Sequence, residues 1–184
     1  MSKTNYSRFF VVDLELTCWA DMPRSEQLAK NEIIEIGLTE IDLKERKILK
    51  SNSYLVKPKN MDISDFCTSL TGITKQQLET ASDLTKVSKQ IRNDFPYFKN
   101  TPWGAWGDDY DAVVRDCASK NAVNPFSDNY YDLQELYTLS NGLDKRVKLN
   151  YVLDTFGMTF QGREHSGKDD SYNTALVLLK MWER

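Results

Sequence analysis

Three strand-like segments follow one another within the first third of the chain, and this succession limits the possible folds more than any other feature of the sequence. Residues 9–16, 32–41 and 48–57 are dense in β-branched and aromatic side chains, and turn-forming or charged residues separate them. Because consecutive strands with short connections usually pair, we expect an antiparallel meander. The first third of the chain is therefore predicted to be sheet.

Helix and strand signals alternate in the rest of the chain. Apolar residues recur at helical spacing in four segments, residues 83–95, 110–120, 147–156 and 170–183. Residues 101–106 are typical of a short strand, and residues 129–133 fit either a strand or the start of a helix. We therefore predict an α/β fold, in which a mixed sheet combines the three-stranded antiparallel meander with parallel strands and is flanked by helices.

The composition fits one folded domain over residues 1–184 and excludes several classes of protein. Only 8 Gly and 5 Pro occur, which excludes disordered and low-complexity chains. The longest apolar run, residues 9–12, is far shorter than the roughly 20 residues that cross a bilayer. Three separate cysteines and an N-terminus without a signal pattern predict a cytoplasmic protein that makes no membrane contact. A net charge of −3 means that phosphates would have to be attracted locally, by a metal centre or a small basic rim.

Two carboxylates lie close together in the first predicted strand. Asp13 and Glu15 are two residues apart, so their side chains emerge on the same face. Adjacent carboxylates in so apolar a strand are costly unless a divalent cation with oxygen ligands neutralises them. The same pair also fits an ordinary strand end whose polar residues reach solvent.

A polar loop before the last predicted helix carries the only histidine of the chain, His165. An imidazole titrates near neutral pH and can accept a proton from water, and in a loop that approaches a helix N-terminus this group stays mobile. Asp170 lies at the predicted helix start and is better placed to hold a metal than to move. A surface histidine and a helix-capping aspartate are the alternatives.

Acidic residues also follow the short strand that ends at Trp106. A carboxylate there would lie at the carboxyl end of a strand, where open α/β sheets bind their ligands. Asp109 shares a helical face with Val113 and Cys117, so we prefer it to Asp108 as a site residue. An acidic helix N-terminus that satisfies the helix dipole is the alternative.

In this order, the motifs resemble those of the DEDDh 3′-to-5′ exonucleases, most closely the branch of the Eri-1 and KapD-type exoribonucleases. The matching segments are residues 13–18 (DLELTC), 31–37 (NEIIEIG), 70–74 (LTGIT), 106–107 (WG) with the acidic cluster behind them, and 160–173 (FQGREHSGKDDSYN). One departure concerns the acidic cluster, because the family's usual spacing from the tryptophan falls on residues that cannot be ligands. Counting back eight residues from Cys117 gives Asp109, and Asp108 stays open as the third ligand.

The resemblance implies a ribonuclease H-like fold and a metal-dependent enzyme. Its cofactors would be two divalent ions, Mg²⁺ or Mn²⁺, bound by the four carboxylates Asp13, Glu15, Asp109 and Asp170, with His165 as general base. The products would be nucleoside 5′-monophosphates released from single-stranded 3′ ends, with RNA or oligoribonucleotides favoured. Hydrolysis of DNA ends in repair or proofreading is the first alternative, and a non-catalytic nucleic-acid-binding module is the second.

Four residues are predicted to contact the substrate. Leu16, Thr17 and Leu70 match positions that line the terminal-nucleotide pocket in the family that the chain resembles. Trp19 follows in a loop, where an indole can stack on a base.

Overall fold

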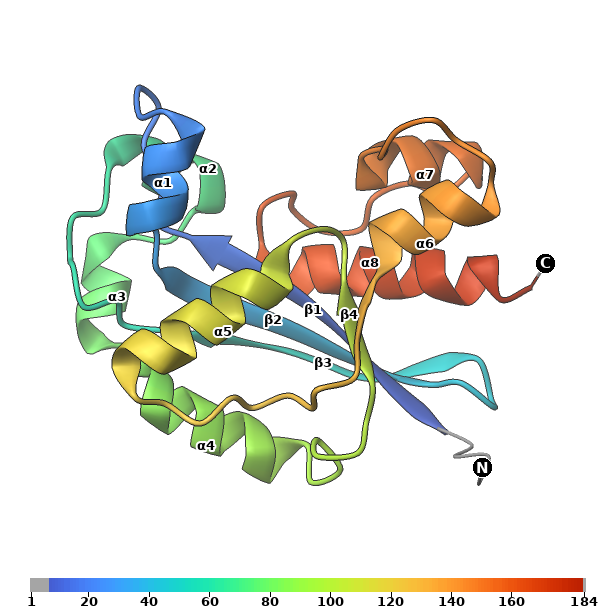
Figure 1. Cartoon of the computed structure of the whole chain (residues 1–184), viewed down its shortest axis with the longest axis horizontal. Coiled ribbons are helices and arrows are strands. Elements are labelled where there is room, and N and C mark those ends of the chain that lie inside the picture. The colour runs from blue at the N-terminus through green and yellow to red at the C-terminus, as the bar shows by residue number, and fades with distance from the viewer. Residues whose placement is uncertain (1–6, 184) are drawn as a thin grey trace.

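The protein, described here from a computed structural model that covers residues 7–183, is built on one five-stranded mixed sheet (Figure 1). The strand order is β3-β2-β1-β4-β5. The strands are β1 (Arg8–Leu16), β2 (Ile33–Asp42), β3 (Lys47–Leu55), β4 (Trp103–Ala105) and β5 (Tyr130–Asp132). Residues 1–6 and 184 of the predicted domain lie outside the described residues.

Strand direction follows the prediction. β1, β2 and β3 pair antiparallel as a meander, while β4 pairs parallel with β1 and β5 pairs parallel with β4. In the β1–β2 register, Asp13 lies opposite Gly37 and Glu15 lies opposite Glu35. β4 pairs with β1 only at Phe10 and Val11, so the carboxyl-terminal half of β1 extends past the end of β4.

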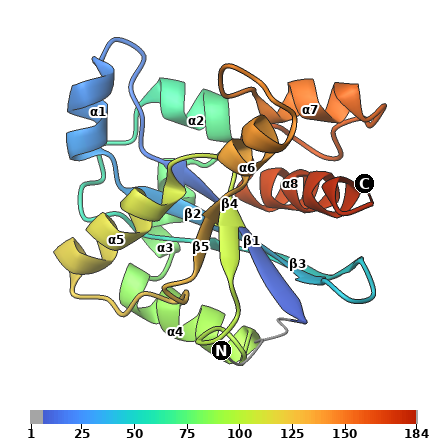
Figure 2. The same ribbon diagram turned by 45° about the vertical axis from the view of Figure 1, so that its right-hand side comes forward.

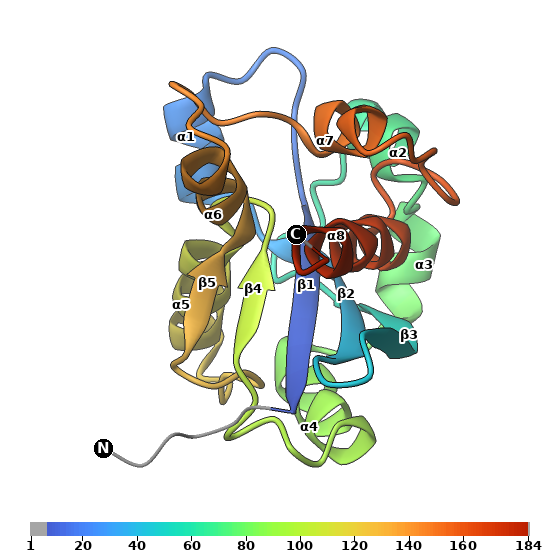
Figure 3. The ribbon, with the colours of Figure 1, turned by 90° about the vertical axis from the view of Figure 1, so that its right-hand side faces the viewer.

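Helices cover both faces of the sheet (Figures 2 and 3). They are α1 (Arg24–Lys30), α2 (Asp65–Thr71), α3 (Lys75–Thr80), α4 (Leu84–Asp94), α5 (Asp109–Lys120), α6 (Leu133–Ser140), α7 (Leu149–Thr155) and α8 (Gly167–Met181). In one core cluster Phe10 and Val12 of β1 pack with Ile91 of α4 and Val113 of α5. No helix in the described part of the chain is long and apolar enough to cross a membrane.

The opposite face of β1 packs against α8. Phe9 and Val11 form a second cluster with Ala175 and Leu178 of that helix. Because side chains alternate along a strand, Asp13 and Glu15 continue the row that Phe9 and Val11 begin. The two carboxylates therefore emerge on the α8 side, where that row reaches the end of the strand.

The predicted mixed α/β sheet with flanking helices is confirmed, and the strong elements lie within a few residues of their predicted bounds. Residues 129–133 contain both alternatives, because β5 ends at Asp132 and α6 begins at Leu133. The short helices α1, α2 and α3 were not predicted. α1 buries none of its residues, so no hydrophobic periodicity marks it in the sequence.

Candidate active site

Close contact between β2 and α8 brings the start of that helix to the carboxylates of β1. A Cβ atom added to Gly37 would lie 1.8 Å from the carbonyl oxygen of Gly167. Only a glycine in β2 therefore allows α8 to begin this close to the sheet. Asp170, in the first turn of α8, is held there by its own bonds: its carboxylate accepts from the Ser166 amide at 3.1 Å, and its amide donates to the Ser166 carbonyl at 2.8 Å.

Three carboxylates converge at this point. Asp13, Glu15 and Asp170 each offer a ligand oxygen, and these oxygens all lie within 4.8 Å of one another. Glu15 is buried, and the other two are partly buried. Segments about 155 residues apart in the sequence thus form one cluster of carboxyl groups.

The predicted third ligand, Asp109, is the first residue of α5. The backbone amide of Leu14 in β1 hydrogen-bonds its carboxylate, and its charge acts on Asp13. Asp108, the alternative, forms ion pairs with Arg146 at 2.8 Å and with Arg24 at 3.8 Å. Asp109 is therefore not among the three residues whose ligand oxygens converge, but it lies beside them against β1, while Asp108 lies in a surface ion-pair network.

Burial and mutual repulsion make the charged forms of these carboxylates costly. Burial is the larger cause for Glu15, whose pKa rises to about 8, and the charges of Asp170, Glu35 and Asp109 add to it. Burial also raises the pKa of Asp13 well above its ordinary value, with Asp109 the strongest repelling neighbour. Such a group of carboxylates is typical of a site that a cation completes.

The two carboxylates at helix N-termini have smaller shifts. Burial and the neighbouring Asp108 charge raise the pKa of Asp109 to about 7, while the Leu14 hydrogen bond opposes the rise. Burial raises the pKa of Asp170 to about 6, and hydrogen bonds from the Ser166 and His165 amides oppose it. The backbone thus helps to keep these two groups ionisable near neutral pH.

The loop between α7 and α8 carries His165 at the edge of the cluster. Its side chain is exposed, its backbone φ is +59°, and its amide hydrogen-bonds the Asp170 carboxylate. A left-handed backbone is costly for a residue other than glycine and persists only where the surroundings impose it. The surroundings therefore hold the loop backbone in this conformation, while the imidazole faces solvent.

The predicted substrate-binding residues are distributed over three places. Leu16 lines a cleft together with Asp109, and Leu70 lies half-buried near the end of α2. Thr17 is buried, and it pairs with Glu32 through its amide at 2.9 Å and its hydroxyl at 2.9 Å. Trp19 lines a separate hollow beside Phe66, so the structure does not bring it into the cleft with Leu16.

One buried carboxylate at the site was missed in the sequence. Glu35 lies opposite Glu15 in the sheet and accepts a 2.8 Å hydrogen bond from the amide of Gly167. It therefore anchors the first residue of α8 next to the cluster. An acidic residue between Ile34 and Ile36 in a buried strand was the available signal.

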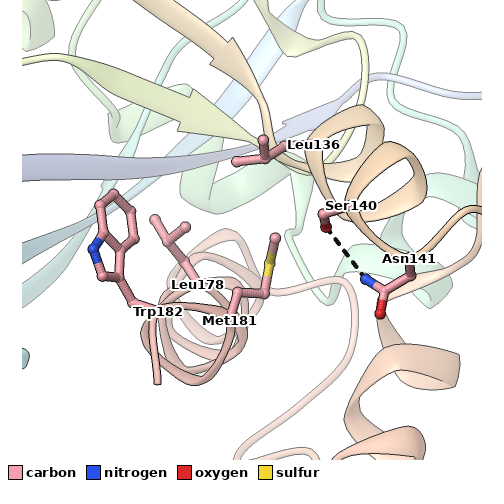
Figure 4. A pocket seen from close by; sticks show the side chains of 6 residues that line it. All are labelled: Leu136, Ser140, Asn141, Leu178, Met181 and Trp182. Atoms are coloured by element: carbon pink, nitrogen blue, oxygen red, sulfur yellow. Dashed lines mark hydrogen bonds between the residues drawn. The ribbon is translucent and has the colours of Figure 1, made fainter. Parts of the chain in front are cut away.

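Another hollow lies between α6 and α8, at the far end of α8 from Asp170 (Figure 4). Its walls are largely apolar, formed by Leu136, Ser140, Asn141, Leu178, Met181 and Trp182. None of these side chains is a plausible acid, base or metal ligand at neutral pH. The acidic cluster is therefore the better candidate for an active site.

The donor set of the cluster fits hard divalent cations. Carboxylate oxygens are the ligands that Mg²⁺ and Mn²⁺ prefer, and two such ions would nearly balance four carboxylates. No histidine or cysteine is among the clustered ligands, so the set does not resemble a zinc site. Burial, and after it the repulsion between these carboxylates, raises the pKa of Asp13 and Glu15, and a bound cation would offset that repulsion.

Comparison with known proteins identifies the family. The profile of the exonuclease family RNase_T matches residues 10–178. The chain belongs to the RNase_T exonuclease family. ERI1 exoribonuclease 2 of Xenopus laevis is 30% identical over 98% of this chain, and 3′-5′ exoribonuclease 1 of Homo sapiens is 27% identical over 96%. The chain covers 30% of the frog protein and 52% of the human one, about half of their lengths or less.

The RNase_T fold is also found among solved structures. The nuclease domain of 3′hExo, described as a DEDDh family member bound to rAMP, superposes with a TM-score of 0.87 at 26% identity. The alignment covers 99% of this chain and 94% of that chain. The resemblance to Eri-1-type DEDDh exonucleases and the ribonuclease H-like fold are thereby confirmed.

Proposed function

We propose that this RNase_T-family chain is a metal-dependent 3′-to-5′ exonuclease that releases nucleoside 5′-monophosphates from single-stranded RNA. The observation that carries the proposal is the convergence of Asp13, Glu15 and Asp170, whose ligand oxygens lie within 4.8 Å of one another. Similarity to two proteins named exoribonucleases supports RNA as the substrate class. A binding-only module would gain nothing from concentrating negative charge where phosphates must sit.

Asp13, Glu15, Asp109 and Asp170 would hold two divalent cations, Mg²⁺ or Mn²⁺. When bound, such a pair makes water a better nucleophile at neutral pH and stabilises the leaving oxygen of an in-line displacement at phosphorus. Asp109 is carried by α5 and the other three by β1 and α8, so the packing of these elements sets the ligand positions.

His165 would accept the proton of the attacking water. Its exposed imidazole lies on a loop whose backbone is tied to Asp170, so the base and a ligand are positioned together. Leu16, Thr17 and Leu70 would line the pocket for the terminal nucleotide. The Thr17 amide donates to the Glu32 carbonyl and its hydroxyl accepts from the Glu32 amide, so Thr17 would meet the nucleotide through its methyl group or its hydroxyl proton. Trp19 would stack on a base farther along the strand.

We further propose that residues 1–184 act as one exonuclease domain in the cytoplasm. All three cysteines are free in the structure, as suits a reducing compartment.

The proposal is tested with single-stranded RNA labelled at either end, beside a DNA of matched sequence, in Mg²⁺, Mn²⁺ or chelator. We expect the 3′ label to leave first as a nucleoside 5′-monophosphate, the RNA to be cut faster, and chelator to stop the reaction. Asp13→Ala is the matched inactive variant. Faster cutting of DNA would overturn the RNA assignment, while hydrolysis in chelator or by Asp13→Ala would overturn the mechanism.

A further inference from the structure

The loop that carries His165 is bonded to the rest of the protein at several points. Asn173 of α8 binds both backbone groups of Gln161, accepting from its amide at 2.9 Å and donating to its carbonyl at 2.8 Å. Asp169 accepts from the amide of Arg163 at 2.9 Å. These bonds fix the start of the loop to α8.

The side chain of Arg163 extends from this loop to a different element. Its guanidinium donates to the carbonyls at the end of α2: Thr71 at 3.1 Å, Leu70 at 2.9 Å and Ser69 at 3.4 Å. The last carbonyls of a helix lack partners within the helix and carry partial negative charge, so they suit a cation. Arg163 therefore links the His165 loop to the segment that contains Leu70.

The end of α2 is shaped to receive this guanidinium. Gly72 caps the helix with a left-handed φ of +71°. A Cβ atom at this position would lie 1.6 Å from Nη1 of Arg163. The absence of a side chain at Gly72 thus makes room for Arg163.

The same geometry argues against Arg163 as a contact for substrate phosphates. Both of its terminal nitrogens already donate to backbone carbonyls, and a phosphate would have to compete with three of these acceptors. Arg163 forms no ion pair among the described residues. The carbonyl oxygens of α2 therefore stabilise its positive charge.

We propose that Arg163 is a positioning residue that sets the placement of His165 relative to the Leu70 segment. This positioning role rests on the proposed function, in which His165 is the base and Leu70 contacts the terminal nucleotide. The Arg163 side chain thereby fixes the distance between His165, which takes the proton, and Leu70, which holds the nucleotide. Misplacement of a reacting group by about 1 Å can cost on the order of 100-fold in rate.

The test is a double-mutant cycle on RNA hydrolysis with Arg163→Met, His165→Ala and the double variant. Met keeps the length of the stem and removes every donor. We expect Arg163→Met to lower kcat by about tenfold with a nearly unchanged KM, and to have almost no further effect in the His165→Ala background. Arg163→Lys, which can still donate to one carbonyl, should restore part of the loss.

Arg92→Met is the matched control, because Arg92 lies on α4 at the opposite face of the sheet, and within residues 7–183 its guanidinium contacts only the Ser88 carbonyl and the Phe98 ring. Hydrogen exchange gives a readout that does not depend on catalysis. Peptides covering residues 160–167 should exchange faster in Arg163→Met, while those of β1 should not change.

Each outcome has a separate meaning. Equal losses from Arg163→Met with and without His165, or unchanged exchange over residues 160–167, would overturn the positioning role. A raised KM with reduced salt dependence would show that Arg163 binds phosphate instead. A wild-type chain that does not hydrolyse RNA would refute the proposed function, and the exchange measurement would still decide whether Arg163 ties the loop to α2.

Discussion

At the scale of single residues, the fold holds four carboxyl groups close together although their charges repel one another. These groups are Asp13, Glu15, Asp109 and Asp170, and their repulsion is a defining property of the candidate site. Burial and the neighbouring charges raise the pKa of each of these carboxyls. Proteins commonly give up stability at functional sites in this way. The cost should therefore be visible when one charge is removed.

Asp13→Asn is predicted to stabilise the metal-free protein and to abolish hydrolysis. It keeps the size of the side chain and removes the charge that meets four other carboxylates, those of Asp109, Asp170, Glu15 and Glu35, for a gain of roughly 1–2 kcal/mol, or a few degrees in Tm. Thermal unfolding in chelator at pH 8 measures this gain. Asp154→Asn, an exposed change on α7, should shift Tm little. A lower Tm for Asp13→Asn would contradict the repulsion.

The neighbours Asp108 and Asp109 provide a matched pair. Asp109→Asn should reduce kcat by about 100-fold or more, because it removes a proposed metal ligand. Asp108→Asn should retain most activity, since this carboxylate pairs with Arg24 and Arg146 at the surface. Steady-state hydrolysis of labelled RNA compares the two. The reverse ranking would assign the third ligand to Asp108.

The raised pKa values also predict how stability and metal binding depend on pH. Glu15, Asp109 and Asp170 have folded-state pKa values of about 8, 7 and 6. Because unfolding returns them to about 4, the folded state binds more protons, and the metal-free protein loses stability as the pH rises from about 4 to 8. Cations bind the deprotonated groups, so the Tm increase caused by Mg²⁺ should grow between about pH 6 and pH 8, where these groups ionise in the folded protein. A constant or shrinking increase would contradict these shifts.

At the scale of elements, the contact between β2 and α8 decides whether the ligands meet. Gly37→Ala would force a Cβ atom against Gly167, and we expect a loss of roughly 1–3 kcal/mol together with lower activity, because Asp170 moves with the helix. Denaturant unfolding and RNA hydrolysis measure both effects. Gly157→Ala is the control. Its left-handed φ of +67° makes an alanine there strained, but no neighbouring atom of the described residues lies within 4 Å of the added Cβ, so activity should persist. Full activity in Gly37→Ala would show that the close approach is not required.

The longer elements could be predicted from the sequence because each has a periodic apolar face. β1 packs Phe10 and Val12 on one side and Phe9 and Val11 on the other, and α4 buries Leu84, Val87 and Ile91. The helices α2 and α3 lack such a face. They begin at capping residues, Ser64 and Thr74, and bury only one or two side chains each, so tertiary packing rather than periodicity defines them.

Part of the candidate site was also predictable from a periodic pattern in the sequence. Strand alternation alone places Asp13 and Glu15 on one face. The choice between Asp108 and Asp109 depends on how α5 begins, and Asp108 takes the cap position with no side-chain cap bond. The roles of Glu35 and Arg163 depend on contacts with segments about 90 to 130 residues away, which a local pattern does not contain.

At the scale of the whole molecule, the chain is acidic and its proposed substrate is a polyanion. The net charge is −3, and Arg146, a basic residue near the cleft, already meets Asp108, Asp132 and Glu135. Local cations at the carboxylate cluster are therefore the proposed source of attraction for the scissile phosphate. The proposed mechanism requires that this cluster bind metal.

Anomalous diffraction from crystals grown with Mn²⁺ and adenosine 5′-monophosphate tests this claim most directly. We expect manganese peaks in contact with Asp13, Glu15 and Asp170, with Asp109 beside them and the nucleotide phosphate at the same place. Manganese bound elsewhere, with no peak between these carboxylates, would contradict it.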